Sequence, residues 1–140
     1  MDTAIMVAAI RSDAGASRVL LRSVLERRRS VTVLVSVALL IEYEAVMTRR
    51  EHLDASGLSA TEVGVILDAF VAIAEPVRLS YLWRPTLPDA DDDMVLEAAV
   101  NGRADAIVTF NMSDLRLAEE RFGITVLSPG GAVKRLEKRP

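Results

Sequence analysis

Apolar and polar positions along the chain follow the periods of helices and strands in turn. Apolar residues at helical spacing predict amphipathic helices over residues 16–28 and 61–74, and a helix over 37–48 that is apolar nearly all round. A β-branched run predicts a buried strand over 31–35. The other elements expected are a strand leading into a helix over 1–10, strands over 76–83, 105–110 and 124–127, and helices over 115–121 and 129–136.

The stretch 88–114 joins an acidic helix start to an apolar strand. A helix opens there on three consecutive aspartates, and we expect it to end at Gly102 in a left-handed C-cap. Asp92 lies on the apolar stripe of this helix, whereas Asp93 is expected to face water together with Glu97. A buried strand follows this helix.

Helix and strand in alternation predict an α/β/α sandwich around a parallel sheet of about five strands, in a single domain over 1–140. In such open sheets, ligands bind outside the carboxyl ends of the strands. The end of the strand at Thr109 and Asn111 and the helix start at Asp92 would both lie at that edge. We therefore expect polar groups to gather there.

Helix-capping signals support these boundaries. Ser36 is expected to cap the helix over 37–48. For the helix over 61–74, the cap is expected at Ser59 or Thr61, and Glu62 stands three residues after Ser59 in a capping-box arrangement.

The composition describes an aliphatic, ordered protein. Of its residues, 51% are hydrophobic and only 4% aromatic, with a mean hydropathy of +0.26, which excludes a disordered chain. The absence of cysteine excludes a disulfide framework and a thiolate nucleophile or metal site, and fits a reducing compartment. The apolar stretch 31–41 is too short to cross a membrane, and the N-terminus has no basic region before an apolar run. A soluble, cytoplasmic protein is expected.

The net charge of −3 is unevenly distributed. Residues 1–50 hold eight arginines against five acids, a balance of +3, and the remainder carries −6. A basic half beside acidic groups suits a phosphodiester ligand, because cations hold the backbone while carboxylates hold metal ions. The alternative is that the arginines at 27–29 simply complement a helix dipole.

Several oxygen-bearing side chains are expected near the same edge of the sheet: Asp2, Glu42, Asp92, Asn111 and Asp114. Carboxylates that converge without histidine or cysteine form a site for a hard cation such as Mg²⁺ or Mn²⁺. Such an ion activates water and neutralises charge on a phosphoryl group. The alternatives are that the glutamates are solvated and that the aspartates only compensate the helix dipole. The single histidine, His52, is expected at the surface.

Three blocks of the sequence resemble PIN domains, specifically the branch of toxins from toxin-antitoxin systems that is described as VapC-like. They read DTAIMVAAIRSDAGASRVLL, SVALLIEYEAVMTRREH and LWRPTLPDADDDMVLEAAVNGRADAIVTFNMSDL. The resemblance implies a single PIN-like domain and a metal-dependent endoribonuclease that hydrolyses single-stranded RNA. It also implies a cytoplasmic protein, commonly a homodimer, that a cognate antitoxin neutralises.

The resemblance also assigns roles to residues. It implies that Mg²⁺ or Mn²⁺ is bound by the four carboxylates Asp2, Glu42, Asp92 and Asp114. Asn111, where many relatives have aspartate, would orient a water or a phosphate as a fifth catalytic residue. Thr109 would add a hydroxyl contact to the substrate, and Arg11 would contact a phosphate.

The sequence also departs from the family pattern. Ala4 stands where a polar residue is usual, and only Met1 precedes Asp2, where the family has several residues of a central strand. One alternative is therefore a catalytically degenerate PIN domain that binds RNA or an antitoxin without cleavage. Another is a receiver-like domain, which is disfavoured because the only lysines are Lys134 and Lys138.

Overall fold

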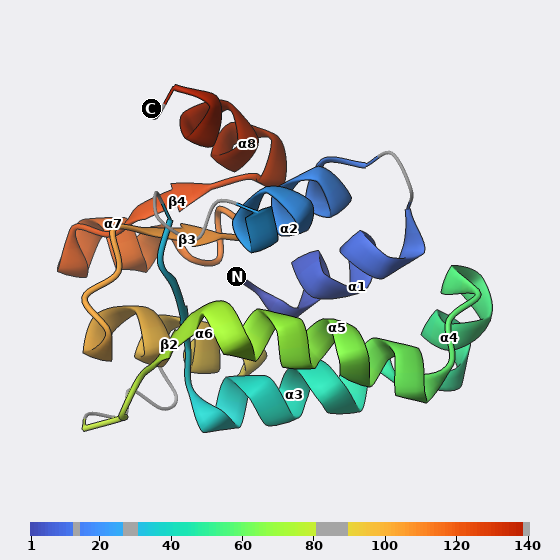
Figure 1. Cartoon of the computed structure of the whole chain (residues 1–140). Helices are drawn as coiled ribbons and strands as arrows, with labels where there is room; N and C mark the ends of the chain where they lie inside the picture. Colours follow the sequence, from blue (N-terminus) through green and yellow to red (C-terminus); the bar gives the residue numbers. More distant parts are fainter. Residues whose placement is uncertain (13–14, 27–30, 81–89, 139–140) are drawn as a thin grey trace.

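The computed structural model describes residues 1–12, 15–26, 31–80 and 90–138. Helices and short strands alternate along them (Figure 1). In chain order the elements are α1 (Thr3–Arg11), α2 (Ala16–Glu26), β1 (Val33–Val35), α3 (Val37–Met47), α4 (Arg50–Ser56), α5 (Ala60–Ile73), β2 (Ala74–Pro76), α6 (Ala90–Asn101), β3 (Ala106–Val108), α7 (Arg116–Phe122), β4 (Thr125–Leu127) and α8 (Pro129–Glu137).

The capping predictions are confirmed. The Ser36 hydroxyl accepts a hydrogen bond from the Leu39 N–H (3.1 Å) at the start of α3. Ser59 and Glu62 form the reciprocal capping box of α5, each side chain accepting from the other residue's N–H at 3.1 Å. These bonds satisfy N–H groups that the first helical turn leaves without partners, so the helix starts are fixed by local sequence.

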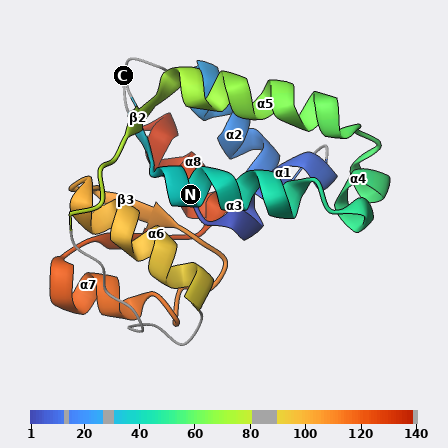
Figure 2. The ribbon, with the colours of Figure 1, turned by 90° about the horizontal axis from the view of Figure 1, so that it is seen from below.

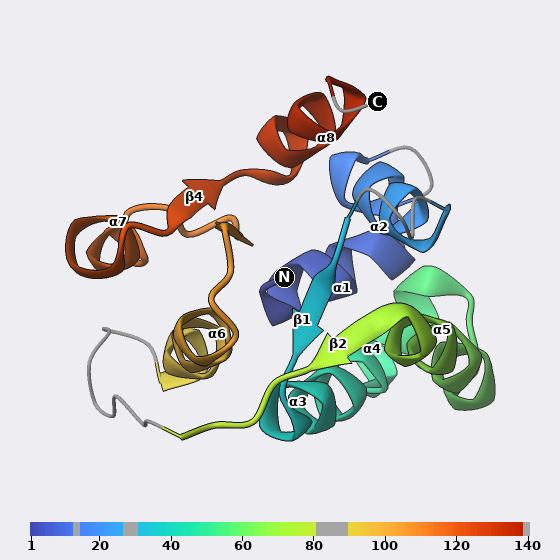
Figure 3. The same ribbon diagram turned by 60° about the vertical axis from the view of Figure 1, so that its left-hand side comes forward.

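The strands pair in parallel, as predicted, but in two separate sheets of two strands each. β1 pairs with β2, and β3 pairs with β4. The described residues therefore do not form the expected sheet of about five strands. In Figure 3, the β1–β2 pair lies with α3 and α5 on one side of the N-terminus, and β4, α6 and α7 lie on the other side.

The strand predicted at the start of residues 1–10 is wrong, because helix α1 begins at Thr3. The buried residues Ile5, Met6, Ala9 and Ile10 recur at helical spacing, so one face of a helix buries them all. Before α1, the Asp2 N–H donates to the Val108 carbonyl (2.9 Å). That backbone bond links the residue before α1 to the edge of β3.

Two further local predictions are wrong, and one helix lies where no element was predicted. Helix α4 was not expected, and Gly57 ends it in the left-handed conformation (φ 75°). The strand predicted over 76–83 ends at Pro76, although 81–83 lie outside the described residues. The left-handed residue after α6 is Arg103 (φ 56°) rather than Gly102.

The hydrophobic core lies mainly between helices. Tyr43 of α3 and Phe70 of α5 are fully buried and meet edge to face, with ring centroids 5.9 Å apart. The Tyr43 hydroxyl donates to the Met1 carbonyl, which ties this core to the start of the chain. α6 packs against α3, β1 and β3 (Figure 2).

In the described part of the chain, no single helix has the length and apolar character to cross a bilayer, and only the bent pair α4 and α5 meets that test jointly, by length and composition.

Gly102 is required where the end of α6 crosses β1, and its replacement tests this packing. A Cβ on Gly102 would lie 2.8 Å from Leu34 Cδ1 and from Val77 Cγ2 and 2.9 Å from the Ala98 carbonyl oxygen. We expect Gly102→Ala to lower the free energy of unfolding by about 1–3 kcal/mol in urea titrations. Gly64→Ala in α5 is the matched control, because a Cβ there meets nothing within 4 Å. It should instead stabilise by about 0.5–1 kcal/mol. Equal effects of the two variants would contradict the close approach.

Candidate metal and nucleic-acid site

A cavity of about 560 Å³ opens where α1, α3, α4 and the start of α6 meet. Three of the four predicted metal ligands and the predicted Asn111 and Arg11 lie in its wall. The lining residues are Asp2, Thr3, Ala4, Val7, Ala8, Arg11, Ser12, Glu42, Val46, Arg49, His52, Asp92 and Asn111. The chain therefore brings residues from positions 2 to 111 to one place.

Asp2 is held at this cavity by its backbone and by its side chain. Its N–H donates to the Val108 carbonyl (2.9 Å), and its Oδ2 accepts from the Thr109 hydroxyl (2.8 Å). The side chain is 5% exposed. The same Thr109 hydroxyl accepts from the Asn111 N–H (3.0 Å). One buried threonine thus sets the positions of two candidate site residues.

Glu42 is held near the start of α1. The Thr3 hydroxyl donates to Glu42 Oε2 (2.8 Å). Glu42 is half-buried, whereas Glu44, two residues later on the same helix, is exposed. The two glutamates of α3 therefore differ: Glu44 is solvated, and Glu42 faces the cavity beside Asp2.

Asp92 lies in the first turns of α6 and is 2% exposed, as its place on the apolar stripe predicts. The expectation that Asp93 and Glu97 face water is wrong, because they are 1% and 0% exposed. α6 is covered by α3 on one side and by β1 and β3 on another, which leaves few of its positions to solvent.

Thr109 and Asp114 differ in their surroundings from the other candidates. Thr109 is fully buried, and its hydroxyl bonds Asp2, so its substrate contact stays a prediction. Asp114 is half-buried in the segment before α7, and it is not one of the described residues that line the cavity. Its metal contact also stays a prediction.

The cavity wall also carries basic side chains. Arg11, at the end of α1, lies with one guanidinium nitrogen 3.1 Å from His52 Nδ1. Arg49 lines the same wall. The prediction of a surface His52 is wrong, since its side chain is only 13% exposed. Arg49 and His52 were missed because nothing in the linear sequence brings α4 to the end of α1.

The donor set suits a hard metal ion in the type of its atoms but not yet in their spacing. Asp2, Glu42, Asp92 and Asn111 offer only oxygen donors, the ligands that Mg²⁺ and Mn²⁺ prefer. Among the described side chains, no three acidic or histidine groups lie close enough to form a metal cluster. The residues fit a hard divalent ion in chemistry, and their side chains must turn toward one another to bind it.

The carboxylates of the cavity also affect the pKa of the buried Tyr43 phenol. Burial raises the pKa of the Tyr43 phenol above its ordinary value, and the negative charges of Asp2 and Glu42 raise it further. Burial lowers the pKa of the Met1 amino group, an effect that the Asp2 carboxylate opposes. Tyr43 therefore stays protonated and keeps donating to the Met1 carbonyl.

A family model described as PIN domain matches residues 1–113. This match covers most of the chain and includes every predicted site residue except Asp114, so the chain belongs to the PIN domain family. PIN domains are a superfamily of nucleases that are generally metal-dependent, and many are toxins of toxin-antitoxin systems. Comparisons with curated proteins and with solved structures gave no match.

The two threonine hydroxyls that orient the carboxylates provide a test of the site. Thr109→Val and Thr3→Val keep the shape of the side chain and remove the bond to Asp2 or to Glu42. We expect each to weaken Mn²⁺ binding about 10–100-fold in calorimetric titrations, because residues that orient ligands have effects of that size. Thr125→Val on the exposed face of β4 is the control and should bind as the wild type does. Unchanged affinity in both site variants would show that the two hydroxyls do not prepare a metal site.

Proposed function

We propose that this PIN domain is a metal-dependent endoribonuclease of a toxin-antitoxin system. The observation that carries the proposal is the single cavity with Asp2, Glu42 and Asp92 in one part of its wall and Arg11 and Arg49 in another. Carboxylates suit divalent cations, and arginines suit the phosphates of a nucleic acid backbone. Together they suit metal-assisted cleavage of a phosphodiester bond.

In this proposal Asp2, Glu42 and Asp92 hold Mg²⁺ or Mn²⁺, and Asp114 completes the set. The ion supplies Lewis acidity toward a phosphoryl oxygen and lowers the pKa of water. Thr109 and Thr3 fix the carboxylates through the hydroxyl bonds described above. The Asn111 amide orients the attacking water or the scissile phosphate.

The arginines hold the substrate strand beside the carboxylates. His52 accepts a hydrogen bond from Arg11 through Nδ1 when its proton is on Nε2. A guanidinium held in this way loses less conformational freedom when it binds a phosphate. Arg49 offers a second positive charge from the same wall.

The finer parts of the proposal rest on the sequence resemblance. They are a single-stranded RNA substrate, neutralisation by a cognate antitoxin, and a homodimeric state. A second function, in which the domain binds RNA or an antitoxin without cutting, is favoured by Ala4 in the cavity wall and by the lack of a ready three-ligand cluster in the described chain. A cleavage assay separates the two.

The expected activity is cleavage of a mixed single-stranded RNA that requires Mg²⁺ or Mn²⁺ and stops with EDTA. Asp92→Asn should lose it by at least about 100-fold, because a neutral amide is a poor ligand for a hard cation. Asp68→Asn on the exposed face of α5 is the matched control and should cut normally. If the wild type binds the RNA but cuts no faster than Asp92→Asn, the domain binds RNA without cutting it, and the nuclease proposal is wrong.

The basic wall is tested by RNA binding in EDTA, where cleavage cannot interfere. We expect Arg11→Gln and Arg49→Gln each to weaken binding and to reduce the slope of log affinity against log salt by about 0.7, the value for one phosphate contact to a single strand. Arg78→Gln, an exposed arginine outside this cavity, is the control and should keep the full slope. Equal slopes in all three variants would show that Arg11 and Arg49 do not contact the RNA.

A further inference from the structure

Two large apolar side chains are exposed on either side of Asn111 in the sequence. Phe110 is 53% exposed and Met112 is 43% exposed. The other two phenylalanines of the chain behave differently, since Phe70 is fully buried and Phe122 packs partly buried against the core. Phe110 therefore contributes little to the core, and its ring is accessible from solvent.

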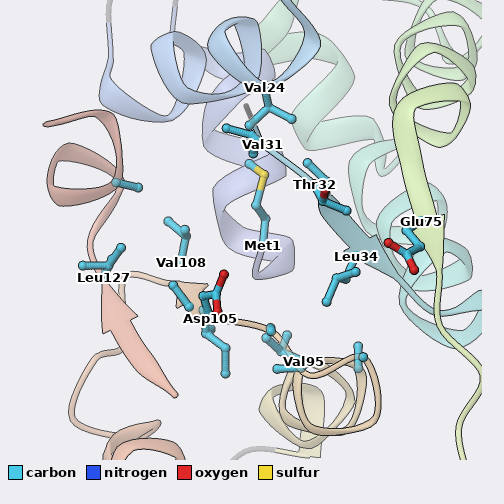
Figure 4. Close-up of a pocket in the computed structure, with 18 of the residues that line it drawn as sticks. Met1, Val24, Val31, Thr32, Leu34, Glu75, Val95, Asp105, Val108 and Leu127 are labelled. Carbon is cyan, nitrogen blue, oxygen red and sulfur yellow. The ribbon is translucent and has the colours of Figure 1, made fainter. Parts of the chain in front are cut away.

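The exposed pair lies outside the internal cavities of the fold. A second cavity, of about 430 Å³, lies between residues 31–34 and residues 105–108, and Figure 4 shows Val108 of β3 in its wall. Phe110 follows two residues later and lines neither this cavity nor the candidate metal cavity, and the same holds for Met112. The two side chains are thus surface features beside the end of β3.

The segment that carries the pair is fixed at both ends. Thr109 before it and Leu115 after it are fully buried. The Asn111 N–H donates to the Thr109 hydroxyl (3.0 Å), and the Leu115 N–H donates to the Asn111 carbonyl (3.3 Å). Because these bonds already order the backbone, a ligand that binds there has less conformational freedom to remove.

The same segment adjoins the acidic part of the candidate metal cavity. Asn111, between the two exposed side chains, lines that cavity. The Thr109 hydroxyl, one residue before the pair, donates to the Asp2 carboxylate (2.8 Å). A nucleotide whose phosphate is bound at the carboxylates therefore has the exposed pair beside it.

We propose that Phe110 and Met112 form a stacking subsite for one unpaired base of the RNA strand. This inference rests on the proposed function, in which the cavity binds RNA. Unpaired bases stack on the faces of aromatic side chains, and such contacts strengthen binding to single strands. The polarisable, flexible Met112 side chain suits contact with the same base.

The subsite selects single-stranded over paired RNA. In a duplex each base is stacked between its neighbours and is not available to a side chain. The Phe110 and Met112 side chains offer no strong hydrogen-bond donor or acceptor, so they do not read the identity of the base. Stacking on them tolerates every sequence, because every base has a π-face.

The surroundings of the pair favour a base over a protein partner. The residues next to it in the sequence are the polar Asn111, Ser113 and Asp114. Two apolar side chains in a polar setting match the area of one base, whereas a stable protein interface needs some 20–30 residues on each side.

The experiment measures affinity by fluorescence anisotropy in EDTA for two ligands. One is a short single-stranded RNA of mixed sequence, and the other is a ribose-phosphate strand of the same length without bases. Phe110→Ala should weaken binding of the RNA about fivefold or more and leave binding of the base-free strand unchanged. Phe110→Tyr keeps the ring and should bind as the wild type does, whereas Phe110→Leu should lose affinity.

Salt dependence separates stacking from a phosphate contact. Phe110→Ala should keep the wild-type slope of log affinity against log salt, because it removes no charge. Met112→Ala should act in the same direction with a smaller loss. Val65→Ala on α5 is the matched control, because Val65 is 63% exposed and lines neither cavity, and it should bind both ligands as the wild type does.

Three results would overturn the subsite and leave RNA binding by the cavity intact. One is equal RNA affinity in the wild type and Phe110→Ala. Another is an equal loss for the RNA and the base-free strand, because Phe110 would then shape the site without contacting a base. The third is unchanged RNA affinity with an altered oligomeric state in sedimentation, which would assign the pair to a protein contact.

The proposed function fails in a different way. If the wild type binds neither ligand, both the proposed function and the subsite are wrong. Base-dependent binding that Phe110→Ala weakens, without any cleavage in Mn²⁺, would support the subsite and contradict only the nuclease.

Discussion

Two hydrogen bonds between Asp2 and the end of β3 determine the geometry of the cavity. The Asp2 N–H donates to the Val108 carbonyl, and its carboxylate accepts from the Thr109 hydroxyl, 107 residues away in the sequence. Because α1 starts at the next residue, these bonds also fix where Thr3 meets Glu42 and where Arg11 meets His52. Asp2, the residue just before α1, thus aligns both parts of the cavity wall.

Helix α1 gives the cavity its division into an acidic and a basic part. Asp2 precedes its first residue and Arg11 is its last, so the two side chains are rooted about 13 Å apart along one rigid element. The other acids come from α3 and α6, and the other cations from the segment around α4. A nucleic acid strand lying along α1 would place one phosphate at the carboxylates and another, farther along the strand, at the arginines.

The sequence was sufficient where the signal is local, and insufficient where distant segments decide. Ser36 and Ser59 marked helix starts correctly because a cap needs only the next three residues. Asp92 was placed correctly by its spacing in α6. His52 and Asp93 were placed wrongly, because their burial depends on other helices packing over them. The expected five-stranded sheet likewise depended on a central strand, and α1 begins too early to leave one within the described chain.

The most direct test of the central claim is the anomalous scattering of manganese in crystals of the protein grown with Mn²⁺. The account predicts a peak in the acidic part of the cavity, within bonding distance of oxygens from at least two of Asp2, Glu42 and Asp92, with Thr109 still bonded to Asp2. A peak elsewhere, or none at saturating Mn²⁺, would contradict the assignment of this cavity as the metal centre of a nuclease.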